Sequence, residues 1–482
     1  MGKLTTIFKD TAIYGLSSII GRFLNYLLVP LYTAQLSAAS GGYGIITNIY
    51  AYVALILVIL TFGMETTYFR FTNKTHTDSE VVYGTTLITV GTISLLFAIL
   101  VLVFLAPISL LMGYGDHPAY VGVMAVTVAI DAFLCIPFAH LRQQKKALKF
   151  AALKLLNIVV SILLNLIYFY FMDGKDVGYA FYINLICTVM LAVCLITEYT
   201  GFRWRLDTKL LRTMLSYSWP ILVLGIAGIL NQTADKMLFP YIYKGDDMLE
   251  QLGIYGACSK IAMIMAMITQ AFRFAYEPIV FAGVKDKDQH EMYAKAMKYF
   301  IIFTLLAFLI VVGYMDILKH IVRNQDYWVG LKVVPIVMAA EIMMGVYFNL
   351  SFWYKVIDKT IWGAIFSGIG CAVLLAVNII FVPRYGYMAC AWGGFAGYGV
   401  AMLASYFVGQ KFYPINYPMK EISFYVVLAF IMYGFMRTAG DWAPVASIAF
   451  NTLLILVFAG IIVKRDLPLG GLPVIGKYFR KK

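Results

Sequence analysis

Two long apolar segments open the sequence, YGLSSIIGRFLNYLLVPLYTAQL (residues 14–36) and GYGIITNIYAYVALILVILTFGMETTYFRF (residues 42–71). Each exceeds the roughly 20 mostly apolar residues that a helix needs to cross a bilayer. The first has no small-residue cleavage site of the kind that ends a removable signal peptide, so we expect it to be retained. The two segments therefore predict a pair of transmembrane helices.

The composition extends this pattern to the whole chain. Of the 482 residues, 62% are apolar and only 13% are charged, whereas soluble proteins have about 45–50% and about 25%. These fractions exclude a water-soluble enzyme and leave no room for a separate soluble domain. The 6 cysteines form no CxxC pair and no cluster with histidine, so we expect neither a disulfide framework nor a metal site.

A hydropathy window of about 19 residues predicts about fourteen transmembrane helices and hence an all-α polytopic membrane protein. The expected spans are residues 11–36, 43–69, 83–112, 118–141, 150–172, 177–200, 215–243, 251–282, 297–318, 329–354, 360–383, 385–410, 421–436 and 443–463.

The basic residues predict an orientation. Most of the 38 Lys and Arg residues fall in the loops that would share one side of the membrane. Because short cytoplasmic loops are rich in Lys and Arg, we expect both termini in the cytoplasm and a location in the inner membrane of a bacterium. The net charge of +13 is explained by these loops and indicates no nucleic-acid partner.

An internal repeat appears when the chain is compared with itself at an offset of about 210 residues. The matched positions carry scarce residue types: Gly15 and Gly225, Asn25 and Asp235, Pro30 and Pro240, Glu65 and Glu277, and Asp131 and Glu341. The repeat predicts two pseudo-symmetric six-helix lobes around a central cavity. We expect lobes over residues 1–200 and 215–412, a basic cytoplasmic linker over 201–214, and two additional helices with a basic tail over 413–482.

Polar and basic side chains within the spans are the candidate substrate-binding residues. They are Arg22, Asn25, Asn231, Asp235, Lys236, Lys260 and Arg273. A charge at bilayer depth costs about 2.5–3.5 kcal/mol on insertion scales, so it faces a cavity or a partner. These cations either hold an anionic group in the cavity or form ion pairs within the bundle. Asp235 and Lys236 project about 100° apart on a helix, so we expect them not simply to neutralise each other.

The carboxylates within the spans are candidates for proton or cation coupling, with a structural role as the alternative. They are Glu65, Asp131, Glu277 and Glu341. Glu277 lies four residues after Arg273, close enough to pair along one helix face. No GxxxxGK[ST], HExxH or GxSxG motif occurs, so the sequence predicts no enzyme, no cofactor and no ATP hydrolysis.

The two opening segments resemble the polysaccharide-export flippases, of the type that flips O-antigen or capsule repeat units. That family belongs to the multidrug/oligosaccharidyl-lipid/polysaccharide exporter superfamily. The resemblance implies a flippase that moves a polyprenyl-pyrophosphate-linked oligosaccharide from the inner to the outer leaflet by alternating access. It also implies that Arg22 faces the cavity. The partners it implies are this lipid-linked glycan, membrane lipid, and the polymerase and glycosyltransferases of the same pathway.

Three other functions remain open at this point. A cation-coupled multidrug exporter would share the fold, as would a flippase of the peptidoglycan lipid precursor. A membrane-embedded glycosyltransferase would need a large polar loop with catalytic carboxylates or histidines. The basic residues within the spans favour an anionic substrate over the organic cations that drug exporters bind with carboxylates.

Overall fold

The computed structural model describes residues 26–73, 78–200, 205–282, 289–357 and 359–466. Throughout these ranges the regular structure is helical, without a strand. Within the described residues, eleven helices are long and apolar enough to cross a membrane. The prediction of an all-α polytopic membrane protein is thus confirmed.

Two further helices occupy predicted spans, α9 (Gly178–Cys194) and α18 (Tyr387–Phe412). The first predicted span, residues 11–36, is described only at its end, which contains α2 (Leu28–Gln35). The count of fourteen spans stays a prediction.

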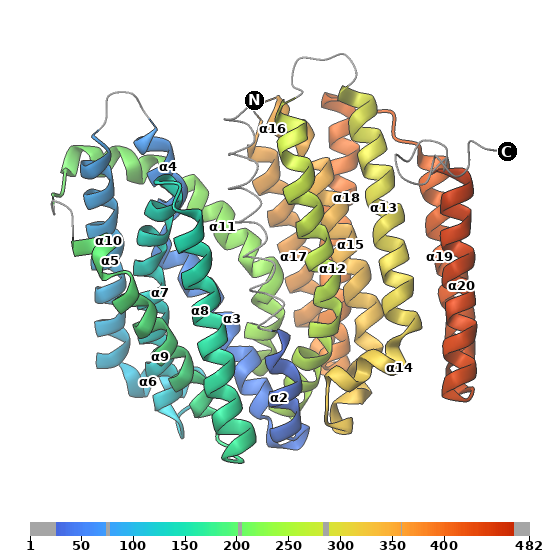
Figure 1. The fold of residues 1–482 in the computed structure, drawn as a ribbon, viewed down its shortest axis with the longest axis horizontal. Coiled ribbons are helices and arrows are strands. Elements are labelled where there is room, and N and C mark those ends of the chain that lie inside the picture. Colours follow the sequence, from blue (N-terminus) through green and yellow to red (C-terminus); the bar gives the residue numbers. More distant parts are fainter. Residues whose placement is uncertain (1–25, 74–77, 201–204, 283–288, 358, 467–482) are drawn as a thin grey trace.

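The helices form two neighbouring bundles and a peripheral pair (Figure 1). The first bundle contains α2, α3 (Gly42–Thr61), α4 (Met64–Thr72), α5 (Ser79–Val103), α6 (Leu105–Leu111), α7 (Pro118–Gln143), α8 (Ala147–Leu166), α9 and α10 (Ile196–Thr200). The second contains α11 (Thr208–Ile242), α12 (Met248–Ala282), α13 (Gln289–Gly313), α14 (Met315–Leu318), α15 (Val334–Leu350), α16 (Phe352–Val356), α17 (Ile361–Tyr385) and α18. The peripheral pair is α19 (Met419–Thr438) and α20 (Pro444–Arg465).

Local sequence explains where several helices begin and break. Asp78 and Asp207 cap α5 and α11 by accepting backbone N–H groups of the first turn, which such short acidic side chains do well. Between α3 and α4, Phe62 and Gly63 both have positive φ angles, 49° and 67°. Two successive left-handed residues cannot continue an α-helix, so the predicted span 43–69 is a helix with a break.

The two ends of the molecule differ in charge. We call one the basic end, because it carries the loop-proximal cations Arg70, Arg142, Lys149, Lys355, Lys411 and Lys464. In Figure 1 it lies at the top, with α4 and α16, while α6 and α14 lie at the opposite end. If the predicted orientation holds, the basic end faces the cytoplasm.

At the opposite end the two bundles touch closely through α3 and α12. A Cβ atom on Gly44 would lie 2.0 Å from the carbonyl oxygen of Leu249, and one on Gly253 would lie 2.9 Å from the amide nitrogen of Gly44. A Cβ atom on Gly256 would lie 2.1 Å from Oγ1 of Thr47. Glycine is therefore required for this helix crossing, which seals the cavity at this end.

Two hydrogen bonds extend the seal. The hydroxyl of the fully buried Tyr327, in the 3-10 helix η4 (Gln325–Val333), donates to the carbonyl of Leu36 at 2.8 Å. The backbone N–H of Arg323 donates to Oγ1 of Thr33 at 3.1 Å. Both contacts join the second bundle to the chain around α2, so the bundles meet over a broad area here.

The peripheral pair is attached to α13 by a charged cluster at the basic end. Lys298 of α13 pairs with Glu421 of α19 and with Asp466, which follows α20. The hydroxyl of Tyr425 also donates to Asp466. These contacts join α13, α19 and α20 around one lysine.

Candidate substrate cavity

A cavity of about 770 Å³ lies between the two bundles. Residues from α2, α3, α8 and α9 line one wall, and residues from α11, α12, α15, α17 and α18 line the other. This is the central cavity that the internal repeat predicts. Its two walls carry different chemistry.

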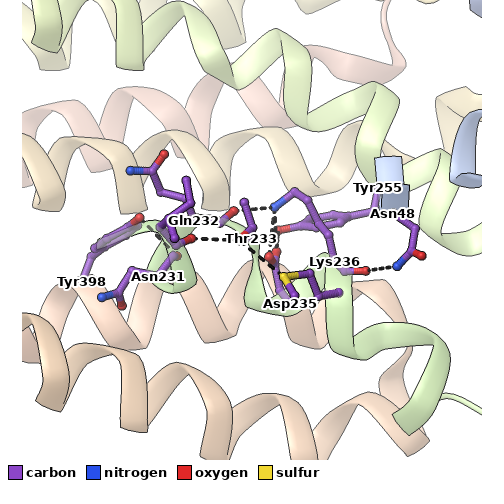
Figure 2. A network of polar contacts seen from close by, with 10 residues as sticks. Asn48, Asn231, Gln232, Thr233, Asp235, Lys236, Tyr255 and Tyr398 are labelled. Carbon is purple, nitrogen blue, oxygen red and sulfur yellow. Dashed lines mark hydrogen bonds and ion pairs between the residues drawn. The ribbon is translucent and has the colours of Figure 1, made fainter. Parts of the chain in front are cut away.

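The wall from the second bundle contains a polar turn of α11 (Figure 2). Nζ of Lys236 lies 2.9 Å from Oδ2 and 3.0 Å from Oδ1 of Asp235, and it also donates to the carbonyl of Gln232 at 3.1 Å. The expectation that Asp235 and Lys236 do not neutralise each other is wrong. The backbone directions differ by about 100°, but the flexible lysine stem folds back and brings its ammonium group to the carboxylate.

Tyr255 of α12 completes this ion pair. Its hydroxyl donates to Oδ2 of Asp235 at 2.7 Å, and Nζ of Lys236 lies 5.1 Å from its ring centroid. Asp235 is buried, with 6% of its side chain exposed, against 23% for Lys236. The carboxylate is thus occupied within the wall, while the lysine is the member of the pair that is more accessible from the cavity.

A proline explains why this turn contacts the first bundle. Pro240 has no N–H group, so the carbonyl of Lys236, four residues earlier, cannot form its helical hydrogen bond. Nδ2 of Asn48, on α3, donates to that carbonyl at 2.8 Å (Figure 2). Asn48 is itself buried and accepts a hydrogen bond from Tyr114. The side chain of one bundle thus satisfies the carbonyl that the proline of the other bundle leaves free.

Two more cations line the same wall. Lys260 of α12 forms no hydrogen bond or ion pair with any residue that the structure describes. The guanidinium carbon of Arg273, also on α12, lies 4.4 Å from the ring centroid of Phe348. Together with Lys236 they give this wall three basic groups, and Lys260 has no ion-pair partner among the described residues.

The described residues that line the wall from the first bundle are polar or apolar and carry no charge, a feature that we did not predict from the sequence. Asn157, Ser161 and Asn165 line the cavity from α8. The hydroxyl of Tyr32 donates to Asn165 at 2.8 Å, whereas Oδ1 of Asn157 is buried without a hydrogen-bond partner in the described residues. The signal was present, because three polar residues spaced by four lie on one face of a helix.

The remaining predicted carboxylates separate into two groups. Glu341 lines the cavity, whereas Glu65 and Asp131 lie within the first bundle. Glu65 accepts hydrogen bonds from Arg142 at 2.5 Å and from Cys135 at 3.2 Å. Asp131 accepts one from Thr188 at 3.1 Å.

Three of the predicted residues cannot be placed in this way. Arg22 and Asn25 lie outside the described residues, and so does the side chain of Glu277. Asn231, Asp235, Lys236, Lys260 and Arg273 all line the cavity. Among the described residues, no group of three or more His, Cys, Asp or Glu side chains has the arrangement of a metal site.

Comparisons with solved structures find the same fold, two helical bundles around a central cavity, in known membrane proteins. A structure described as the lipid II flippase MurJ in an inward closed conformation matches with a TM-score of 0.75 and 14% identity, over 93% of this chain and 98% of that one. An inward-facing multidrug resistance MATE family transporter of the MOP superfamily matches with a TM-score of 0.67 and 13% identity, over 81% and 94% of the two chains. At such low identity, these matches establish the fold.

The family follows from the sequence itself. The family model of polysaccharide biosynthesis proteins matches residues 39–325, more than half of the chain. The chain therefore belongs to that family. No curated protein matches the chain in full-sequence comparison.

Proposed function

We propose that the protein flips a polyprenyl-pyrophosphate-linked oligosaccharide from the inner to the outer leaflet of the bacterial inner membrane by alternating access. Both termini then lie in the cytoplasm, with the basic end of the molecule facing the cytoplasm. The two lobes, residues 1–200 and 215–412, move relative to each other, with residues 201–214 as linker and residues 413–482 as an added pair of helices with a tail.

The observation that carries this proposal is the chemical difference between the two cavity walls. Lys236, Lys260 and Arg273 form a cationic wall, and diphosphate oxygens are natural partners of such groups. The opposite wall offers amides and hydroxyls, of which Asn157 has an unpaired buried oxygen. A glycan presents many hydroxyl groups that donate to such acceptors. A substrate with an anionic part and a sugar part matches both walls.

Of the two carboxylates that line the described cavity, Asp235 favours this substrate over an organic cation. Asp235 is already engaged by Lys236 and by the hydroxyl of Tyr255. Lys260, in contrast, has no ion-pair partner among the described residues. A drug cation would have to displace Lys236 from Asp235 and would meet like charge on the same wall. The multidrug exporter is thus the weaker alternative.

The coupling of transport to an ion is a separate part of the proposal. We assign it to Asp131 in the first bundle and to Glu341 on the cavity, since these carboxylates occupy matched positions of the repeat. The other candidates, Glu65 and Glu277, are also matched, but Glu65 is held by Arg142. Asp131→Asn and Glu341→Gln are expected to change the pH or ion dependence of flipping.

The test is a flipping assay in proteoliposomes with a fluorescent polyprenyl diphosphate oligosaccharide. Lys260→Gln is expected to slow flipping at least about tenfold, because hydrogen bonds to charged groups contribute about 1.5–3 kcal/mol. Lys244→Gln is the matched control, since it removes the same charge from an exposed loop between α11 and α12. Unchanged flipping by the Lys260 variant would contradict the proposal.

The same proteoliposomes separate the alternatives. Transport of the peptidoglycan lipid precursor in preference to the oligosaccharide lipid would identify a precursor flippase. Accumulation of a fluorescent organic cation, abolished by Asp235→Asn and insensitive to Lys260→Gln, would identify a multidrug exporter. Each outcome is distinct from the expected one, in which the lysine variant loses flipping of the glycan lipid.

A further inference from the structure

A second cavity with basic residues lies in a groove between the end of α4 and the first turns of α11. Its volume is about 570 Å³, and its lining residues are Arg70, Phe71, Arg212, Thr213, Ser216 and Tyr217. None of these residues lines the central cavity. We call it the α4–α11 groove.

Aromatic and apolar contacts hold the residues of the groove in place without a ligand. The guanidinium carbon of Arg70 lies 4.1 Å from the ring centroid of Tyr217. That ring packs against Phe71, with centroids 6.2 Å apart. Phe71 is buried in a hydrophobic cluster with Met214, so the end of α4 is held against α11. Arg70 is thus oriented by stacking and keeps its N–H donors available.

The two arginines have no counter-charge in the described part of the chain. Arg70 and Arg212 are both exposed, and neither forms an ion pair with a described residue. The nearby carboxylates are engaged elsewhere. Glu65 is bound by Arg142 at 2.5 Å, and Asp207 caps α11 through the N–H groups of Lys209 and Leu210. The groove therefore presents two uncompensated guanidinium groups.

The position of the groove indicates where its ligand comes from. Trp219 lies two residues after Tyr217 on α11 and is 59% exposed. Exposed tryptophans are typical of the level of lipid headgroups. Arg205 and Lys209 precede the groove at the start of α11 and are exposed. The groove thus lies where a lipid headgroup in the leaflet of the basic end would meet the protein.

We propose that the α4–α11 groove binds the phosphate or diphosphate group of a membrane lipid. Arginine presents a planar fork of N–H donors that matches phosphate oxygens, and the hydroxyls of Thr213 and Ser216 line the same space. An anionic phospholipid and an isoprenoid diphosphate that carries a glycan share this chemistry. The second source rests on the proposed function, and binding there would place the substrate at the protein before it reaches the central cavity.

The test measures lipid binding to the purified full-length protein by native mass spectrometry. The probes are a short-chain polyprenyl diphosphate and phosphatidylglycerol, with phosphatidylcholine as the uncharged reference. Arg70→Gln combined with Arg212→Gln is expected to weaken binding of an anionic probe at least about tenfold. Arg205→Gln combined with Lys209→Gln removes the same charge at the same end and is expected to leave affinity within about twofold.

The probes whose binding is lost identify the lipid that supplies the phosphate group. Loss for both probes assigns the groove to lipid phosphate in general, and loss for one probe assigns it to that lipid. Equal loss in the control pair, or no loss in the groove variant, overturns the proposal. If the double variant does not fold, Arg212→Gln alone is measured instead. Arg212 forms no ion pair with a described residue, so its substitution removes no such contact. Normal binding by the groove variant with lost flipping in Lys260→Gln would overturn this inference and leave the proposed function intact.

Discussion

The two bundles come from one repeat but place their charges differently. Asp131 lies inside the first bundle, where Thr188 donates to it and Lys154 is a charged neighbour. Its counterpart Glu341 lines the central cavity, on the same wall as Lys260. The comparison shows that a repeat can preserve the position of a carboxylate while one bundle uses its charges within its interior and the other presents them to the cavity.

The largest effect on stability is expected from Lys154→Met in the first bundle, which is compared with Lys260→Met in the second. Lys154→Met is expected to lower the free energy of unfolding by about 3 kcal/mol, because it leaves the half-buried Asp131 without its neighbouring cation. Methionine can replace the cation–π contact of the Lys154 ammonium group, 4.0 Å from the ring centroid of Phe138, with a sulfur–aromatic contact. Thermal or denaturant unfolding in detergent measures the change.

Lys260→Met is the matched substitution in the second bundle. Because Lys260 has no ion-pair partner in the described residues, its removal is expected to leave stability unchanged or higher. An equal loss of stability in both variants would mean that the two lysines have the same structural role, and the contrast between the bundles would not hold.

Two glycines at the sealed end test the repeat, because Tyr43 and Gly44 correspond to Tyr255 and Gly256 when the chain is compared with itself. Gly44→Ala is expected to cost about 2 kcal/mol, because the new Cβ atom meets the backbone carbonyl of Leu249, which cannot move without the helix. Gly256→Ala meets Oγ1 of the Thr47 side chain, and Thr47→Ala is expected to rescue it in part, because the Cβ atom of residue 47 stays 3.0 Å away. Equal cost for both glycine variants, or no rescue, would argue against this difference between the helices.

The contact between Asn48 and the carbonyl of Lys236 is expected to contribute about 1–2 kcal/mol, since its loss leaves a buried carbonyl unpaired. Asn48→Leu should therefore lower the unfolding temperature. In a Pro240→Ala background the helix regains its own N–H donor, so the same substitution should cost less. A double-mutant cycle measures this coupling, and strict additivity would show that the asparagine does not act on the proline site.

The smallest expected effect is on the pH dependence of stability, through the contacts that attach the peripheral helix pair. Burial opposes ionisation of Asp466, but the contacts with Lys298 and Tyr425 outweigh it and lower the pKa of this carboxyl. A carboxyl with a lowered folded-state pKa stabilises the protein at neutral pH. That contribution is lost as the pH falls from about 4, the ordinary pKa of aspartate, through the folded-state value. Asp466→Asn should flatten the pH dependence of unfolding below pH about 4, and an unchanged profile would exclude this role.

The sequence predicted the fold well because long apolar segments are a strong signal for membrane helices. It also selected six cavity residues of the second bundle, since polar side chains within such segments are scarce. It could not predict that Lys236 folds back onto Asp235, because that depends on a flexible side chain and on Tyr255 from another helix. The asparagines of α8 were missed because we searched for charge.

For Arg22, only the sequence gives a prediction. The resemblance implies that it faces the cavity, and it lies outside the residues that the structure describes. Its role in binding the diphosphate stays a prediction. Arg22→Lys should retain part of the flipping and Arg22→Ala should lose most of it, because lysine keeps the charge without the bidentate geometry. Flipping assays with equal amounts of membrane-inserted protein measure both.

The hydrogen bond from Asn48 also bears on the mechanics of alternating access. Near Lys236, α11 is tied to α3 through this bond, and the hydroxyl of Tyr52 on α3 reaches the carbonyl of Met237 at 3.3 Å. Earlier on α11, Nδ2 of Asn231 donates to the carbonyl of Ser367 on α17 at 2.9 Å. One helix is thus anchored to both bundles within two turns. If the bundles rock as proposed and both contacts persist, α11 bends between these anchors, in the turn that carries the Asp235–Lys236 pair.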